Sequence, residues 1–201
     1  MVETAERRMS LAEFLVWDDG TDTRYELVNG APRAMAPAYP RHGLIQRNAG
    51  DVILDRIGRG KQCRVYDQAG VVLSVLGDDR YYIPDVTMSC EALGDDLYLR
   101  EPRLIVEVLS PSTGRDDKAV KVPHYCALPT VEEVWLIDSQ RAIVLVWQKR
   151  GGQWIGSLPL QPGQGFESEL LGGTVAIADL FLGSGLEAAD VSPSRASPEG
   201  G

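Results

Sequence analysis

Two acidic residues stand inside stretches of sequence that otherwise predict buried strands. Glu107 lies in the middle of an aliphatic run, Leu104–Leu109, that is bounded by Pro102 and Pro111. Short runs of leucine and β-branched residues predict a strand that is buried on both faces. An ionised carboxylate without a partner in a dry core is strongly destabilising, so Glu107 must be paired, protonated or bound to a metal.

Asp85 is the nearest residue that could share this role. It stands near the end of a second strand-like run, Tyr81–Val86. Side chains on neighbouring strands lie about 5 Å apart, so two carboxylates placed there can share one ion. The pair therefore predicts that the two runs are neighbouring strands and that Asp85 and Glu107 hold one divalent cation.

Length and composition suit one globular domain over residues 1–182. The chain has 201 residues, of which 44% are hydrophobic, and this is enough for a substantial core. No run approaches the ~20 apolar residues of a membrane span, and the charged start of the chain lacks the apolar segment of a signal peptide. We therefore expect a soluble cytoplasmic protein that does not bind membranes, with a disordered tail over residues 183–201.

The net charge is −9 and the isoelectric point is about 4.7. This is the wrong sign for a protein that binds nucleic acid through a broad basic surface. An enzyme needs only a local basic groove, however, and bound divalent cations cancel negative charge where a phosphate must approach. The charge therefore argues against a nuclease without excluding one.

Three cysteines, Cys63, Cys90 and Cys126, are spread along the chain. Their number is odd, and they lack the CxxC or Cys/His spacing of zinc sites. This pattern argues against a disulfide framework and against structural zinc. We expect three buried or half-exposed thiols.

The N-terminal half contains three clear signals of secondary structure. Residues Ser10–Glu13 have the form of a capping box, which predicts a short helix. Residues 24–30 predict a strand that leads into an Asn-Gly hairpin turn, and periodicity alone favours Glu26 as a solvated residue of an edge strand. Apolar residues at helical spacing predict a helix over residues 41–57 that Gly58 ends.

The rest of the chain predicts a mostly antiparallel sheet and one further helix. Asp117, Lys121 and Tyr125 recur at intervals of four and would share a helical face, where Asp117 and Lys121 alone would form an ordinary ion pair. Pro123 interrupts this helix and predicts a kink or a new start. The expected strands are 71–75, 81–86, 131–138, 143–149 and 154–160, with 87–102 as a loop or short helix and 174–181 packed at the end.

Five segments in this order resemble the Uma family of putative restriction endonucleases, bacterial proteins placed in the PD-(D/E)XK nuclease superfamily. The resemblance covers about residues 10 to 182. The segments are Arg24–Gly30, Pro40–His42, Ile83–Val86, Val106–Thr113 together with Asp117, Lys121 and Tyr125, and Glu133–Asp138.

The resemblance implies an α/β (α+β) fold with a restriction-endonuclease-like core, in which helices flank a mixed central β-sheet and the active site lies at one sheet end. It also implies that Asp85 and Glu107 bind the metal, with the backbone carbonyl of Val108 as a third ligand. Glu26 matches an additional acidic residue of the family. These residues, with a lysine, would be the catalytic group.

The position of that lysine departs from the superfamily. The superfamily usually carries it two residues after the second acid, where this sequence has Leu109. The family carries it on the following helix, where Lys121 is the match, although Pro123 departs from the residues usual there. The matched segments imply that substrate is bound by Arg41, His42, Ser110, Ser112, Asp117 and Tyr125.

These residue types suit phosphodiester hydrolysis. Carboxylate oxygens favour Mg²⁺, with Mn²⁺ as a possible replacement, and the ion keeps waters available for deprotonation. Lys121 would orient or deprotonate the attacking water and screen negative charge, and Glu26 would hold a second metal or a metal-bound water. The function implied is a magnesium-dependent endonuclease that acts on DNA.

Two other functions are compatible with the same residues. A non-catalytic nuclease-like module that binds nucleic acid or protein would use the acids only in ion pairs with Lys121, Lys118 or Arg115, and would have no divalent affinity. A hydrolase of another phosphoester would bind metal but fail on DNA and RNA. Paired cleavage of two strands makes a homodimer plausible.

Overall fold

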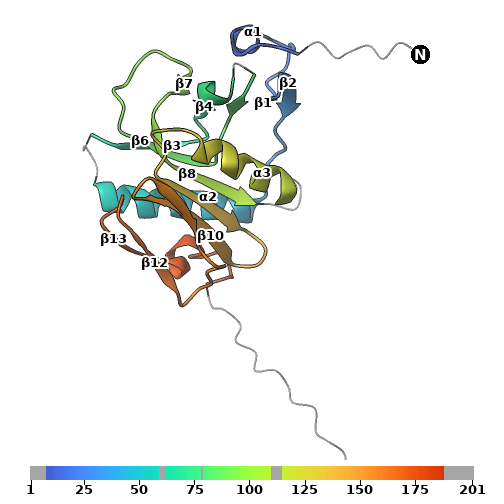
Figure 1. The fold of residues 1–201 in the computed structure, drawn as a ribbon. Coiled ribbons are helices and arrows are strands. Elements are labelled where there is room, and N and C mark those ends of the chain that lie inside the picture. The colour runs from blue at the N-terminus through green and yellow to red at the C-terminus, as the bar shows by residue number, and fades with distance from the viewer. Residues whose placement is uncertain (1–7, 59–61, 78, 110–114, 188–201) are drawn as a thin grey trace, which may run out of the picture.

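A six-stranded mixed sheet forms the centre of the molecule (Figure 1). The computed structural model describes residues 8–58, 62–77, 79–109 and 115–187, without the side chains of residues 115–119. Strands β8 and β9 are parallel, and the other pairs of this sheet are antiparallel. In spatial order the strands are β11 (Gln153–Gly156), β10 (Ile143–Arg150), β9 (Glu133–Asp138), β8 (Pro102–Leu109), β6 (Val86–Ser89) and β3 (Arg64–Asp67).

A second sheet of five short strands lies beside the first. Its β1–β2 hairpin turns at Asn29 and Gly30, whose φ angles of 51° and 78° are the left-handed values that a tight two-residue turn requires. The predicted Asn-Gly turn is confirmed. In spatial order the strands are β2 (Ala31–Ala34), β1 (Tyr25–Val28), β5 (Tyr81–Tyr82), β4 (Gly70–Val72) and β7 (Tyr98–Leu99), while β12 (Gly165–Ser168) and β13 (Gly173–Ala176) form a separate pair.

Four α-helices complete the described part of the chain. The capping box of Ser10 and Glu13 starts α1 as predicted, and Gly58 ends α2. Pro123 lies inside α3, so the helix continues through it. None of the described helices is long and apolar enough to cross a membrane. The helices are α1 (Leu11–Leu15), α2 (Pro40–Ile57), α3 (Arg115–Cys126) and α4 (Ile177–Leu180), with a short 3₁₀ turn η1 (Ser74–Leu76).

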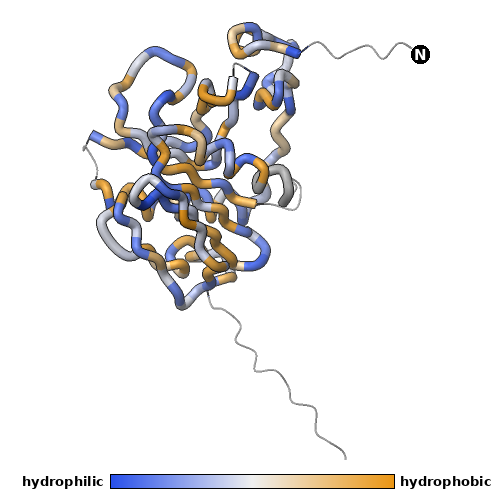
Figure 2. The backbone as a smooth tube through the Cα atoms, in the orientation of Figure 1, coloured by the Kyte–Doolittle hydropathy of each residue, from blue (hydrophilic) through white to orange (hydrophobic). Residues whose placement is uncertain are grey.

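Apolar residues gather on both faces of the central sheet, and Figure 2 shows hydrophobic stretches of the backbone, in orange, running through the centre of the molecule. Successive side chains of a strand point to opposite faces, and β8 follows this rule. Leu104, Val106 and Val108 pack with α2 and α4 in one cluster, whereas Ile105 packs with Val122 and other residues of the opposite cluster. Helices on both faces of a mixed sheet confirm the expected fold class.

The structure corrects the predicted strands around Asp85. The run 81–86 is two strands that belong to different sheets, because Pro84 has no N–H to donate and interrupts the ladder. Part of the predicted loop 87–102 instead continues β6, and another part forms β7. Asp85 therefore stands in the bend just before β6.

The prediction of three thiols is wrong for two of the cysteines. Cys63 and Cys90 form a disulfide, and Cys126 is free and half-buried. The register of β3 and β6 pairs Arg64 with Ser89, so the two cysteines face each other just beyond the last pair. Cysteine number and spacing carry no information about this register.

Candidate active site

Asp85 and Glu107 lie opposite each other at one end of the central sheet. The antiparallel ladder of β6 and β8 pairs Val86 with Val106, so the next positions outward are Asp85 and Glu107. Both residues are buried, at 3% and 1% exposure. The Oδ2 atom of Asp85 accepts a hydrogen bond of 2.7 Å from the N–H of Val108. The predicted proximity of Asp85 and Glu107 is confirmed, but of the run 81–86 only Val86 belongs to the strand that neighbours β8.

Tyr125 holds the carboxylate of Glu107 from the side of α3. Glu107 shares the strand face of Ile105, and its Oε1 accepts a hydrogen bond of 2.6 Å from the Tyr125 hydroxyl. Tyr125 is completely buried. Burial, together with the negative charge of Glu107, raises the pKa of Tyr125 well above its usual value. The phenol therefore stays protonated and remains a hydrogen-bond donor to Glu107.

Lys121 joins Glu26 to this centre. Its Nζ donates to both carboxylate oxygens of Glu26, at 2.7 and 2.6 Å, and lies 3.7 Å from Oε1 of Glu107. Glu26 also accepts a hydrogen bond of 2.8 Å from the N–H of Ile83. The expectation of a solvated edge position for Glu26 is wrong, because β1 lies between β2 and β5 and the side chain is buried.

The protonation of Glu26 is set by opposing effects. Burial is the largest and raises the pKa of Glu26 above its usual value; the charge of Lys121 opposes the rise, and the charge of Glu107 adds to it. The raised pKa shows that the cost of burying the charged carboxylate of Glu26 outweighs its attraction to Lys121.

Tyr82 contacts the lysine and His124 contacts Tyr82, and neither residue was recognised from the sequence. The Lys121 Nζ lies 5.0 Å from the centre of the Tyr82 ring, a cation–π contact. The hydroxyl of Tyr82 is 2.8 Å from Nδ1 of His124. His124 is one helical turn from Lys121, so the spacing of three residues was the available signal.

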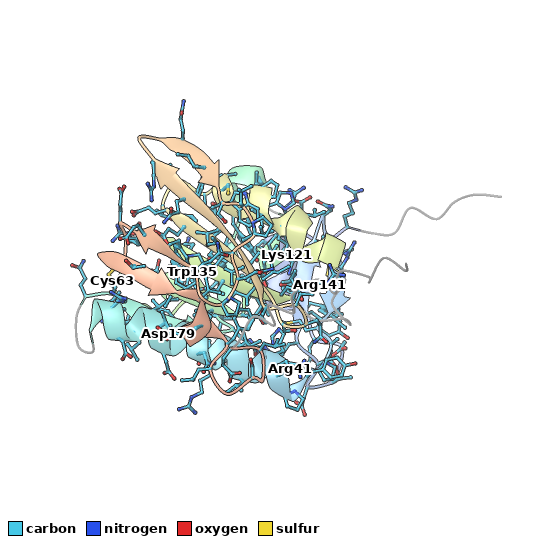
Figure 3. All side chains as sticks on the ribbon, turned by 90° about the horizontal axis from the view of Figure 1, so that it is seen from below. Arg41, Cys63, Lys121, Trp135, Arg141 and Asp179 are labelled. Carbon is cyan, nitrogen blue, oxygen red and sulfur yellow. A yellow bond between two sulfur atoms is a disulfide. The ribbon has the colours of Figure 1, made fainter. Side chains whose placement is uncertain are left out.

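Arg41 and His42 lie at the start of α2, near Asp85. His42 is 3% exposed, and its Nε2 is 3.4 Å from Oδ1 of Asp85, whereas Arg41 is exposed. Figure 3 shows Lys121 on α3 and Arg41 at the start of α2. Among the other predicted substrate-binding residues, Ser110, Ser112 and the side chain of Asp117 lie outside the described residues.

The charge of this centre is compatible with a divalent cation. Glu26, Asp85 and Glu107 bring three buried carboxylates together, and Lys121 offsets one of these charges. In the part of the chain that is described, no three His, Cys, Asp or Glu side chains form a ready-made metal site. Mg²⁺ does not need one, because it binds one or two carboxylates and keeps several waters.

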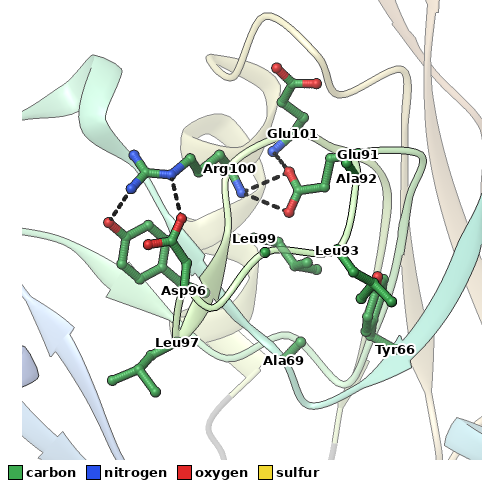
Figure 4. A pocket seen from close by; sticks show the side chains of 12 residues that line it. Tyr66, Ala69, Glu91, Ala92, Leu93, Asp96, Leu97, Leu99, Arg100 and Glu101 are labelled. Atoms are coloured by element: carbon green, nitrogen blue, oxygen red, sulfur yellow. Dashed lines mark hydrogen bonds and ion pairs between the residues drawn. The ribbon is translucent and has the colours of Figure 1, made fainter.

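The pocket in Figure 4 is lined by different residues. It has a volume of about 410 Å³ and lies along the loop between β6 and β7. Its polar groups bond to one another: Arg100 contacts Asp96 and Tyr98, and Glu91 accepts from the N–H groups of Arg100 and Glu101. None of its lining residues is a predicted site residue.

Known proteins resemble this chain in sequence and in fold. Two similar proteins come from Synechocystis sp. (strain ATCC 27184 / PCC 6803 / Kazusa), and both are named as uncharacterized. One is 24% identical to this chain, over 88% of this chain and 93% of the relative. The other is 27% identical, over 77% of this chain and 89% of the relative. A crystal structure described as a putative nuclease belonging to DUF820 from Anabaena variabilis ATCC 29413 matches with a TM-score of 0.69 and 19% identity, over 86% of this chain and 97% of that chain. The Uma2 family model, described as "Putative restriction endonuclease", matches residues 11–178. The family match spans most of the chain and confirms the resemblance in the sequence, so the protein belongs to the Uma2 family.

Proposed function

We propose that this protein is a divalent-metal-dependent endonuclease that hydrolyses phosphodiester bonds of DNA. The observation that carries the proposal is the convergence of Glu26, Asp85, Glu107 and Lys121 at one end of the central sheet. Four buried charged side chains from separate segments are costly to assemble, and such clusters are typical of functional sites.

Asp85 and Glu107, with the backbone carbonyl of Val108, would hold Mg²⁺ or Mn²⁺. The N–H of Val108 fixes one oxygen of Asp85, and the hydroxyl of Tyr125 fixes one oxygen of Glu107. A bound divalent cation would supply charge neutralisation at the phosphate and would make a water more acidic. Tyr125 is too deeply buried to contact substrate, so we assign it to positioning Glu107.

Lys121 would stabilise negative charge as the phosphodiester reacts, and would orient the attacking water. Its ammonium is held between Glu26 and Glu107 and over the Tyr82 ring, so it needs little rearrangement to act. Glu26 fixes Lys121 with two hydrogen bonds. We therefore assign Glu26 to orienting the lysine and keeping it charged.

Calorimetry of the metal-stripped protein tests the site without a choice of substrate. The titrants are Mg²⁺ and Mn²⁺, and the variant Asp85→Asn/Glu107→Gln removes both charges with little change in shape. Saturable binding in the wild type that the variant lacks supports the metal site. Equal binding in both proteins, or none in either, contradicts it and favours a non-catalytic binding module.

Cleavage assays then separate the substrates. Supercoiled and linear DNA, RNA and a simple phosphodiester are incubated with the metal-loaded protein and with the same variant. Cleavage of DNA that the variant loses supports the proposal. Hydrolysis of the simple phosphodiester alone would favour an enzyme of another phosphoester. Sedimentation with and without DNA tests the expected homodimer.

A further inference from the structure

Tyr82 contacts two groups of the candidate site at once. The ammonium of Lys121 lies over its ring, with Nζ 5.0 Å from the ring centre. Its ring also meets the ring of Tyr125 edge-on, with 5.8 Å between the centroids, and Tyr125 holds Glu107. Tyr82 is only 1% exposed, so water is excluded from these contacts. The electron density of this ring is therefore part of the environment of Lys121.

His124 connects this buried ring to the surface of the protein. Its Nδ1 is 2.8 Å from the hydroxyl oxygen of Tyr82, and the two rings stack with their centroids 5.9 Å apart. Its side chain is half-buried, so it can exchange a proton with solvent. Histidine is the side chain whose ordinary pKa lies closest to neutral pH. A group that gains and loses a proton thus lies two contacts away from Lys121.

The two charge states of His124 require opposite hydrogen bonds with Tyr82. A neutral imidazole with its proton on Nε2 accepts at Nδ1, so the hydroxyl of Tyr82 is the donor. An imidazolium carries protons on both nitrogens, so Nδ1 must donate and the oxygen of Tyr82 must accept. A phenol that donates has a more electron-rich ring, and a phenol that accepts has a poorer one. The face of an electron-rich ring attracts a cation more strongly, so neutral His124 favours the contact with Lys121.

We propose that His124 and Tyr82 are positioning residues for Lys121, and that protonation of His124 weakens the hold on the lysine and lowers the activity of the site. Neutral His124 accepts from the Tyr82 hydroxyl, and the ring then supports the ammonium. The charged imidazolium reverses this hydrogen bond. The effect on activity rests on the proposed function, because Lys121 acts there on the reacting phosphodiester. The link between His124 and Lys121 does not depend on it.

The groups around His124 favour its neutral form near neutral pH. Burial lowers the pKa of His124 below its usual value, and the positive charge of Arg80 adds to this effect. Arg80 lies just before β5 and is paired with Asp79 at 2.8 Å. On α3 itself, Lys121 stands one turn before His124. The hydrogen bond from Tyr82 is therefore present at neutral pH and is reversed on the acidic side of neutrality.

The experiment is an NMR titration of the isotope-labelled protein in EDTA between about pH 5 and 8. The ring ¹⁵N signals of His124 report which nitrogen carries the proton, and the Cε signal of Lys121 reports the surroundings of the ammonium. We expect the proton of neutral His124 on Nε2, and a shift of the Lys121 signal with the same midpoint as His124. A neutral ring with its proton on Nδ1, or a Lys121 signal that does not follow His124, would overturn the proposal.

Three substitutions separate this link from other titrations at the site. Tyr82→Phe keeps the ring and removes the hydroxyl, so the Lys121 shift at the His124 midpoint should disappear. His124→Asn presents an oxygen in place of Nδ1 that accepts but cannot be protonated, and it should also remove the shift. Tyr81→Phe is the matched control, because its hydroxyl is on the neighbouring residue, which packs against Phe14, and the shift should remain. A shift that survives in either of the first two variants, or is lost in the control, would contradict the link.

The pH profile of DNA cleavage tests the effect on the proposed reaction. As pH falls through the His124 midpoint, cleavage by the wild type should drop about threefold more than cleavage by His124→Asn, because the variant keeps the acceptor. Tyr82→Phe should also lack this additional drop. A purely structural role would change cleavage by the same factor at every pH. Parallel profiles of the wild type and His124→Asn would therefore refute the positioning role.

Failure of this link and failure of the nuclease give different results. A protein that cleaves DNA while the Lys121 signal ignores the titration of His124 would refute the link alone. A protein in which Lys121 follows His124, but which binds no divalent cation and cleaves no DNA, would refute the nuclease and leave the link in place.

Discussion

Buried carboxylates lie at both ends of the central sheet, with Glu133 at one end and the three acids of the candidate site at the other. Glu133 begins β9 and pairs with Leu104 near the start of β8, whereas Glu107 lies near the end of β8. Glu133 accepts hydrogen bonds from three neutral donors, Trp135 at 3.0 Å, Ser168 at 2.7 Å and Gln148 at 3.0 Å. The site contains three carboxylates and a lysine.

The difference shows that burial of an acidic side chain does not by itself indicate a site. Burial raises the pKa of Glu133 as it raises that of Glu26. The donors around Glu133 are neutral side chains that satisfy one carboxylate, so nothing further is required there. At the other end, like charges face one another, and an additional cation would lower the free energy of the folded state.

The two ends can be compared by neutralising one glutamate at each, and the largest effect is expected for Glu107. In Glu107→Gln, hydrolysis should fall by roughly 10³-fold or more, about 4 kcal/mol, because a proposed metal-binding carboxylate is lost. Its stability should be kept or raised, since repulsion with Glu26 disappears. Calorimetry with Mn²⁺, cleavage assays and urea unfolding measure these effects.

Glu133→Gln is the matched control and should have the opposite profile. Its new amide presents N–H groups to donors, so unfolding free energy should fall by about 1–3 kcal/mol, while divalent affinity stays within about twofold of the wild type. Equal loss of divalent binding in the two variants would break the distinction between the two ends.

Removing Lys121 should lower both the stability of the folded protein and its activity. In Lys121→Met the buried carboxylate of Glu26 loses its partner, and the unfolding free energy should fall by about 3 kcal/mol, as for other broken buried pairs. The double variant Lys121→Met/Glu26→Gln should recover most of this loss without recovering cleavage. Urea unfolding of the single and double variants measures the coupling, and simple additivity would argue against the pair.

A smaller effect is expected from the tyrosine that positions Glu107. Tyr125→Phe removes one hydroxyl, and the affinity for Mn²⁺ should fall about tenfold, as for other residues that orient a ligand. Trp135→Phe removes the indole donor to Glu133 and part of the packing around it, and the affinity for Mn²⁺ should stay unchanged. Calorimetry of both variants makes the comparison, and an unchanged affinity in Tyr125→Phe would refute the positioning role.

Much of the site was predictable because its residues interrupt regular patterns. Glu107 stands out in an aliphatic strand, and the register of β6 and β8 places Asp85 opposite it, as the sequence predicts. The interactions between segments were not predictable from residue patterns, and only the family resemblance implied that Glu26 and Lys121 share one site. Glu26 and Lys121 meet across 95 positions of sequence, and no periodicity connects them.

For the fold as well, local elements were predictable and long-range pairing was not. Local chemistry specified the Asn-Gly hairpin and the ends of α2, and both are present. Strand pairing depends on contacts distant in sequence, which explains the missed β3 and β12, the division of 81–86 between two sheets, and the Cys63–Cys90 disulfide. Whether a buried glutamate is satisfied by neutral donors, as Glu133 is, also depends on such contacts.

The smallest expected effect is the pH dependence of stability, which both ends share in the absence of metal. The folded-state pKa values of Glu26 and Glu133 are raised above the usual 4.5, so the folded protein binds these protons more tightly than the unfolded chain does. The associated stability is fully present below about pH 4.5 and is lost as pH rises through the folded-state values. Urea unfolding between pH 4 and 8 should therefore show a decline that Glu26→Gln and Glu133→Gln each reduce. Mg²⁺ should reduce only the contribution of Glu26, because a cation at the site favours its ionised form; an equal change at Glu133 would show that the ion acts through general screening.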